Sequence, residues 1–338
     1  MASTVITQID FNSSAFKDIM LGVFTDKLGL LSSGILQTVP DAVISSQDKG
    51  YTVSIPHYNT ISGDSDQITT GLTTTVNALA TYKDIGVWAE REKAWGADQM
   101  IRVIAGADPM AEVARQVGEY LAVEAHKQAM STITGVFATE LATTHSTGGD
   151  FAGAEIEPGG VLAAKQKLGD NQDQLTEAVM NSKVYQDALK NGLIVNQVNN
   201  VSNDFYRTGM IGKMLGMNTT MSDKLTATSS VYPTYFAAPG AVIYKYRERP
   251  VSVETNANIT RISVGGIIAD LEKHRVALTA GGQDVLILRY SLLTHVPGVQ
   301  FDGTVATNPT NTQLATATSW TKVATDDKLI KIVELKTL

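Results

Sequence analysis

The feature of this chain that most constrains its fold is a join between two long elements. From Tyr51 to Trp88 the sequence alternates with a period of two around a polar, glycine-containing tip, which predicts an extended two-stranded hairpin. From Asp108 to Phe137 it follows the helical period, which predicts one helix of roughly eight turns. A hairpin of roughly 30 Å and a helix of roughly 40 to 45 Å are too long to be buried within one compact domain. We therefore expect the chain to be completed by copies of itself.

The predicted hairpin has a tip over residues 61–71 that is rich in turn-forming residues. Pro56 cannot donate a ladder hydrogen bond and marks a strand end, while the return strand is expected at Leu72 to Leu79, continuing toward Val87. An isolated ribbon of this length is marginal in water, so we expect it to rest on a neighbouring subunit. The side chains expected at contacts between subunits are Ile61, Asp64, Asp66, Ile68 and Leu72 in the hairpin and Phe16 and Phe24 before it.

The predicted helix has a clear start. Asp108 is a favourable N-cap, Pro109 suits the first helical position, and Glu112 places negative charge in the first turn. One row of apolar residues then recurs every four positions, at Val113, Val117, Leu121, Ala125, Ala129 and Ile133. This pattern predicts a long helix with one buried face.

Residues 1–48 have the pattern of an arm that lies on another surface. Two short amphipathic stretches, Ala15 to Val23 and Phe24 to Leu36, are interrupted by glycines and closed at Pro40. The chain begins almost directly at this arm, so we expect no cleaved segment before it.

The remainder predicts a separate unit of helices and strands, followed by strands that return. Helices are expected at Gly160 to Leu168 and from a capping Ser182 to Lys190. The expected strands are Leu175 to Met180, Leu193 to Val198, Gly212 to Thr219, Ala241 to Tyr246, Val251 to Val253, Asp284 to Val296 and Lys328 to Leu335.

The composition of the chain argues against several classes of function. The 338 residues are 43% hydrophobic and 18% charged, which suits a globular chain with a sizeable core. A formal net charge of -7 argues against a surface that grips nucleic acid. The sequence has no cysteine, so disulfides and thiolate metal sites are excluded. No apolar run is long enough to span a membrane, and no signal peptide is recognised.

The sequence contains no recognisable catalytic, cofactor or metal-binding motif. The five histidines lack metal-binding spacing, and the glycines at 209–213 lack the spacing of a phosphate loop. The carboxylate pairs Asp64 with Asp66 and Asp326 with Asp327 are interpreted as solvated turns, and His126 as part of a solvated helix face. The aromatic residues Tyr232, Tyr235, Phe236, Tyr244 and Tyr246 are interpreted as core or subunit packing. We therefore expect no enzyme activity and no cofactor.

The order of elements resembles the major capsid protein of tailed bacteriophages with the Hong Kong 97-like fold. Short segments of the sequence also resemble segments of that family, and the resemblance covers nearly the whole chain. The segments are residues 178–185 followed by Leu189, 212–217 leading to Ser222 and Asp223, 285–290 through His295 and Gly298, 308–314, 319–323 and 330–333.

The resemblance implies an α+β fold with four parts. These are an N-terminal arm at 1–48, an E-loop hairpin at 49–90, a peripheral domain at 91–139 and 283–338 that contains the spine helix, and a mixed axial domain at 140–282. Some members of the family crosslink through an E-loop lysine. Residues 61–71 contain no lysine, so that chemistry is not expected here.

The implied function is structural. Hexamers and pentamers of the chain would form an icosahedral shell around packaged double-stranded DNA, in a virion assembled in the host cytoplasm. Its partners would be itself, a portal, and scaffolding or decoration proteins, with non-specific proximity to DNA and no membrane. The alternatives are an encapsulin-like compartment with enzyme cargo, an oligomeric enzyme and a tail-tube protein.

Overall fold

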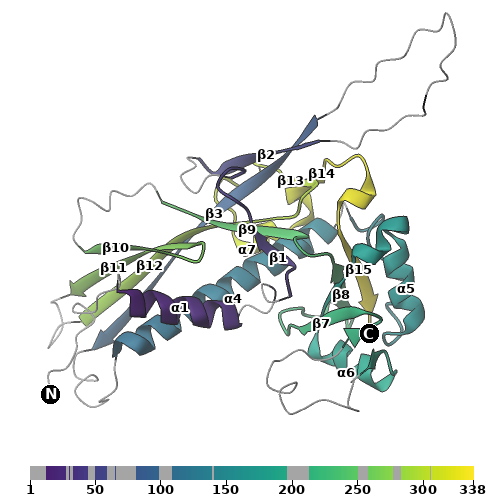
Figure 1. Cartoon of the computed structure of the whole chain (residues 1–338), viewed down its shortest axis with the longest axis horizontal. Helices are drawn as coiled ribbons and strands as arrows, with labels where there is room; N and C mark the ends of the chain where they lie inside the picture. The colour runs from purple at the N-terminus through teal and green to yellow at the C-terminus, as the bar shows by residue number, and fades with distance from the viewer. Residues whose placement is uncertain are drawn as a thin grey trace, which may run out of the picture.

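The structure is a computed structural model with a mixed α+β architecture (Figure 1). It describes residues 13–27, 30, 33–44, 50–58, 65, 81–98, 109–138, 141–195, 213–249, 258–276, 283–304 and 306–338. A long twisted sheet carries two helices along one face, and a smaller unit with its own sheet and helices lies at one end. The hairpin strands leave the long sheet at its edge and point away from both units.

The first sheet has seven strands, and its long strands come from distant parts of the chain. Its members are β1 (Leu36–Thr38), β2 (Thr52–Tyr58), β3 (Thr81–Asp98), β9 (Val242–Arg247), β10 (Ile259–Val264), β11 (Ile267–Val276) and β12 (Gln283–His295). β12 is antiparallel to β3, β9 and β11, whereas β1 is parallel to β9. The predicted strand at 284–296 is confirmed as β12.

The long helix predicted from the sequence is confirmed as α4 (Pro109–Ala138), which crosses one face of the first sheet. The apolar row along it is buried from Val117 to Ile133, because it packs on the sheet and on α1 (Ser14–Lys27). The two helices approach closely at Gly118, where a Cβ atom would lie 2.5 Å from the carbonyl oxygen of Met20. Only glycine permits this contact at that position.

The N-terminal segment differs from the predicted pair of short pieces. Residues 14–27 form the single helix α1, and it packs against the chain's own α4. Phe16 and Phe24 are 0% and 1% exposed in the main core. Because the segment finds its apolar surface within the same subunit, these two side chains are core residues here and are not available to a neighbour.

The second sheet has six strands and a separate core. Its members are β4 (Glu177–Met180), β5 (Ile194–Val195), β6 (Lys213–Met214), β7 (Met217–Met221), β8 (Tyr232–Ala237) and β15 (Ile332–Thr337). Helices α5 (Pro158–Gln166) and α6 (Ser182–Lys190), with the 3-10 turn η2 (Gly169–Gln174), complete this second unit. The predicted helices near 160 and 182 are confirmed, but the side chain that caps α6 belongs to Asn181 and accepts from the Lys183 amide.

A small C-terminal segment covers the end of α4. It contains β13 (Val299–Phe301), β14 (Trp320–Lys322), α7 (Asn311–Leu314) and the 3-10 turns η4 (Ala317–Ser319) and η5 (Asp327–Leu329). Trp320 is 2% exposed, and its indole nitrogen donates to the carbonyl oxygen of Leu314 at 2.7 Å. A Cβ atom at Gly135 of α4 would lie 2.0 Å from that same oxygen, so the helix backbone touches the segment directly.

Several predicted strand boundaries are wrong. The stretch expected as one strand at 212–219 is a tight hairpin of β6 and β7, and β3 continues to Asp98, past the strand end expected near Val87. The first sheet contains strands from both sides of residue 282, since β9 to β11 precede it and β12 follows it, while β15 belongs to the second sheet. Strands β8, β10 and β11 were not predicted at their observed bounds, and the strands expected at 72–79 and 251–253 lie outside the described residues.

Candidate assembly surfaces

The hairpin is joined to the body by one continuous strand. β3 pairs with β2 from Thr81 to Val87 and with β12 from Trp88 to Asp98, so a single strand belongs first to the hairpin and then to the main sheet. The base of the hairpin also covers a small apolar cluster, made of Ile44, Val53, Ile55, Trp88 and Leu293. Because strand β3 is shared, the direction in which the hairpin leaves the body is set by the sheet.

Arg247 of β9 connects β3 with the segment just before β2 at the hairpin base. Its side chain is 3% exposed, and its guanidinium contacts Glu90 of β3 at 3.0 Å and lies 5.0 Å from the centre of the Trp88 ring. It also donates to the Ser291 hydroxyl at 3.0 Å and to the carbonyl oxygen of Gly50, just before β2. One buried cation therefore links β3 and β12 to the segment that leads into β2.

Asp84 forms a second contact at the hairpin base. This carboxylate of β3 is fully buried and accepts a hydrogen bond of 2.7 Å from the amide of Gly298. The Nε2 atom of buried His295 lies 3.6 Å from the same carboxylate. Gly298 has a φ of +92°, and a Cβ there would lie 2.8 Å from Ile330, so the chain at this point accepts only glycine without rearrangement.

Lys245 of β9 fastens the segment that leads from β1 toward the hairpin. Its ammonium group is 2.5 Å from the Asp41 carboxylate and donates to the carbonyl oxygen of Val39 at 2.6 Å. Lys245 and Arg247 alternate with the core residues Tyr244 and Tyr246, so both cations lie on the face of β9 opposite the core. The sequence analysis did not single out these cations. The alternation of Tyr244, Lys245, Tyr246 and Arg247 predicts a strand with its charges on one face, but it does not indicate what covers that face.

The face of the first sheet opposite α4 carries linked charges. Arg289 of β12 lies between Glu92 of β3, at 2.9 Å, and Glu272 of β11, and Glu272 also contacts the ring of His274. The hydrogen bond from Arg289 holds the pKa of Glu272 below its usual value. Arg261 pairs with Asp270 at 2.8 Å on the same face. These pairs give the sheet a polar outer surface.

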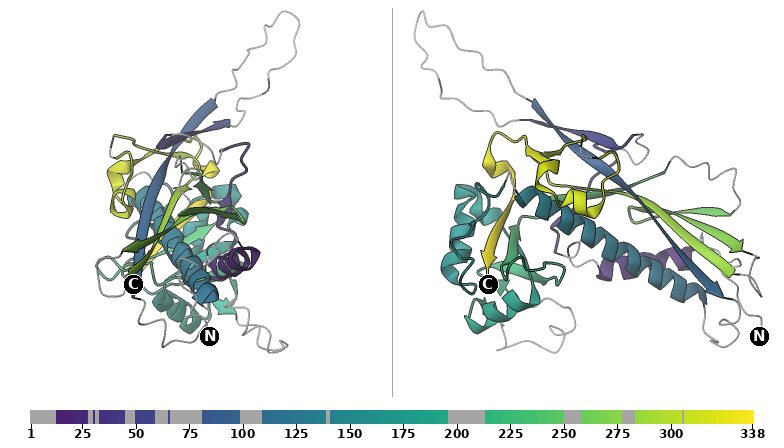
Figure 2. Two further views of the ribbon diagram at one scale, coloured as in Figure 1. Left: turned by 90° about the vertical axis from the view of Figure 1, so that its left-hand side faces the viewer. Right: turned by 180° about the vertical axis from the view of Figure 1, so that it is seen from behind.

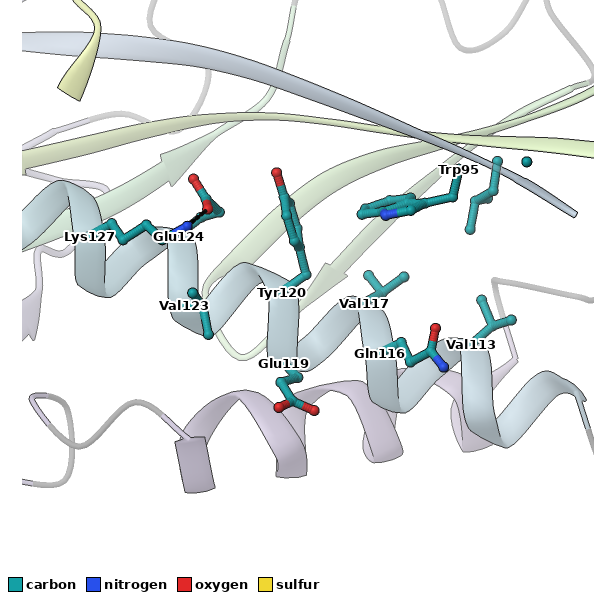
Figure 3. Close-up of a pocket in the computed structure, with 11 residues that line it drawn as sticks. Trp95, Val113, Gln116, Val117, Glu119, Tyr120, Val123, Glu124 and Lys127 are labelled. Atoms are coloured by element: carbon teal, nitrogen blue, oxygen red, sulfur yellow. Dashed lines mark hydrogen bonds and ion pairs between the residues drawn. The ribbon is translucent and has the colours of Figure 1, made fainter. Parts of the chain in front are cut away.

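An apolar groove lies between β3 and the first half of α4 (Figure 3). Trp95 stands above Val113 and Val117, and its ring meets that of Tyr120 edge to face with centroids 5.0 Å apart. The cavity has a volume of about 590 Å³, and the ion pair of Lys127 with Glu124 lies toward one end. Partly exposed aromatic rings in a groove are typical of protein contact surfaces.

The second unit joins α4 through polar contacts. His126 of α4 lies 2.7 Å from the hydroxyl of Ser222, which follows β7, and burial lowers the pKa of His126 to about 4. The prediction of a solvated face at His126 is therefore wrong, because the second unit covers it. In a nearby cleft, burial raises the pKa of Glu334, which accepts from Ser146 and pairs with Lys336 at 3.3 Å.

The hairpin residues predicted to contact other subunits are not placed by the structure. Ile61, Asp64, Asp66, Ile68 and Leu72 all lie outside the described residues. The structure brings together instead the polar residues at the hairpin base, which no motif had marked. The predicted packing role of the aromatic cluster is confirmed for its four buried members, Tyr235, Phe236, Tyr244 and Tyr246.

Within the described residues, no group of three or more histidine, aspartate or glutamate side chains is arranged to hold a metal ion. In those residues, too, no helix is long and apolar enough to cross a membrane. Asp326 and Asp327 both serve local structure, since Asp326 caps η5 and Asp327 pairs with Lys322.

Comparison with known proteins gives one sequence relative and several structures of the same fold. No family model matches the chain. The chain is 25% identical over 346 residues to the major capsid protein of Bacillus phage SPP1, covering 99% of this chain and 98% of that protein. The capsid of Ralstonia phage GP4 aligns with a TM-score of 0.54 and 11% identity over 100% of this chain and 94% of that one. The capsid of an empty GTA particle aligns with a TM-score of 0.50 and 12% identity, covering 92% and 90%.

The fold is that of a phage capsid subunit. The resemblance to a phage major capsid protein that the sequence predicts is confirmed, because the similarity to the SPP1 protein extends over almost the full length of both chains. The two solved capsid structures show the same fold.

Proposed function

We propose that this chain is the structural subunit of a Hong Kong 97-like icosahedral shell, in which hexamers and pentamers enclose packaged double-stranded DNA. The observation that carries the proposal is the full-length similarity to the SPP1 major capsid protein. The hairpin at 49–90 would act as the E-loop, α4 as the spine helix, and the second unit as the axial domain. Contact residues in the hairpin would include Ile61, Asp64, Asp66, Ile68 and Leu72.

The hairpin base supports this proposal physically. A hairpin that crosses to a neighbour transmits force only if its base is fixed, and Arg247 and Asp84 fix it at two points with buried charge-assisted contacts. The net charge of -7 is compatible with DNA that packs inside without being immobilised. A portal and scaffolding or decoration proteins would be further partners, and assembly would take place in the host cytoplasm.

The test is to purify the expressed full-length chain and examine it by size-exclusion chromatography and electron microscopy. We expect closed shells or ring-shaped capsomers, and particles isolated from infected cells should contain double-stranded DNA. A stable monomer under all conditions would refute assembly. Particles that contain a protein cargo and no DNA would refute the proposed contents and point to a compartment.

A further inference from the structure

The tip of the β6–β7 hairpin in the second unit carries an unusual residue for its backbone conformation. Met214 pairs with Met217, which leaves Leu215 and Gly216 as a two-residue loop. The φ angles of these residues are +47° and +86°. A two-residue loop with both angles positive is a type I′ turn, whose first position favours asparagine, aspartate or glycine. Here that first position is leucine.

A leucine in the left-handed region is strained, because its Cβ atom approaches the following carbonyl oxygen. Glycine and asparagine avoid or tolerate that approach and occur at such positions routinely. Gly216, at the second position, follows the rule, and a Cβ there would meet no atom within 4 Å. The strain is therefore confined to Leu215, and the isolated subunit would be more stable with a turn-forming residue at that position.

The side chain of Leu215 gains little burial within its own subunit to offset this strain. It is 44% exposed, whereas the flanking Met214 and Met217 are 0% and 1% exposed and fill the second core. The same part of the second unit carries another exposed leucine, Leu189, which is 37% exposed at the end of α6. The turn after Leu189 leads into β5, and β5 pairs with β6.

We infer that Leu215 is a contact residue between copies of this chain, and that its side chain is buried against the second unit of a neighbouring copy. The inference rests on the proposed shell, in which every copy would make the same contact. Strained residues are retained where the strain serves a site, and within the described residues this side chain is not enclosed by its own subunit. An apolar contact repeated in every copy would compensate a strain that every copy carries.

The experiment compares the full-length wild-type chain with Leu215→Asn and with the control Leu215→Met, which keeps both the strain and the apolar side chain. Unassembled Leu215→Asn subunits should unfold at higher denaturant, with at least about a fivefold larger ratio of folded to unfolded chains. The subunit concentration at which shells form should rise about tenfold, because a buried leucine contact is lost. Leu215→Met should match the wild type in both measurements.

Three results would overturn the inference, and they can be told apart. If Leu215→Asn assembles at the wild-type concentration, Leu215 makes no contact between copies. If the unassembled Leu215→Asn subunit is less stable than the wild type, the leucine is buried within its own subunit. If the wild-type chain forms no shells, the proposed function fails and the contact fails with it, whatever the variant does.

Discussion

At the scale of single residues, the subunit depends on a few buried charges at the hairpin base. Arg247 reaches Gly50, Glu90 and Ser291 from a position that is almost fully buried. A buried arginine is stable only when its donors are paired, so each partner depends on the others. Asp84 adds a second buried contact at the base through the Gly298 amide.

Replacing Arg247 with glutamine should therefore destabilise the folded subunit. The shorter neutral side chain cannot reach all three partners, and it leaves Glu90 without its closest cation. We expect the unassembled subunit to lose about 3 kcal/mol of unfolding free energy, measured by denaturant titration. Arg115→Gln is the matched control, because Arg115 forms only exposed pairs on α4 and its loss should not change stability measurably. Equal effects of the two substitutions would contradict the role given to Arg247.

His126 should make stability depend on pH. Burial lowers its pKa in the folded subunit to about 4, whereas an unfolded histidine titrates near about 6.5. Between about pH 4 and about pH 6.5 the unfolded chain binds more protons than the folded chain. The contribution of His126 to the unfolding free energy is therefore fully present above about pH 6.5 and is lost as the pH falls toward about 4. From pH 7.5 to pH 5 we expect this residue to remove about 2 kcal/mol of unfolding free energy.

The measurement for His126 is the difference between the wild type and His126→Gln across that pH range. Other groups titrate too, including His145, whose pKa burial also lowers. They are common to both chains and cancel in the comparison. The variant should show a flatter pH dependence by about 2 kcal/mol, and parallel curves would contradict the buried environment of His126.

At the scale of elements, the sequence predicted what periodicity and capping control. α4 and β12 follow unbroken apolar patterns over many residues, so their existence and extent were predictable. The β6–β7 turn was missed because Leu215 is not a turn-forming residue and its neighbours continue a strand pattern. The extension of β3 to Asp98 was missed because residues 90–93 are charged, although they pair with β12.

The candidate site was harder to predict than the elements. Arg247, Glu90 and Gly50 come from three separated stretches, and only the paired strands bring them together. Charged residues inside strands look like a solvated face in a sequence, and nothing local indicates that a hairpin base covers them. Phe16 and Phe24 were predicted to contact a neighbouring subunit. The sequence does not reveal that α4 of the same subunit packs against them.

At the scale of the whole molecule, the subunit has a packed body and a hairpin that leaves it. The body has two main cores, one beneath the long sheet and one in the second unit, while the hairpin base covers a third, smaller cluster. The strands β2 and β3 extend away from these cores (Figure 2). In the proposed shell, the packed body would fold within each subunit and the hairpin would be the part that reaches the neighbour.

The most direct test of this account is to delete residues 62–70 and compare the variant with the wild type by electron microscopy and circular dichroism. The deleted residues lie beyond the paired strands of the base, so the body should keep its fold and its unfolding transition. We predict that the wild type forms shells and that the folded variant fails to close them. Shells of normal size from the variant, or unfolding of the variant subunit, would contradict the central claim that the hairpin joins folded subunits.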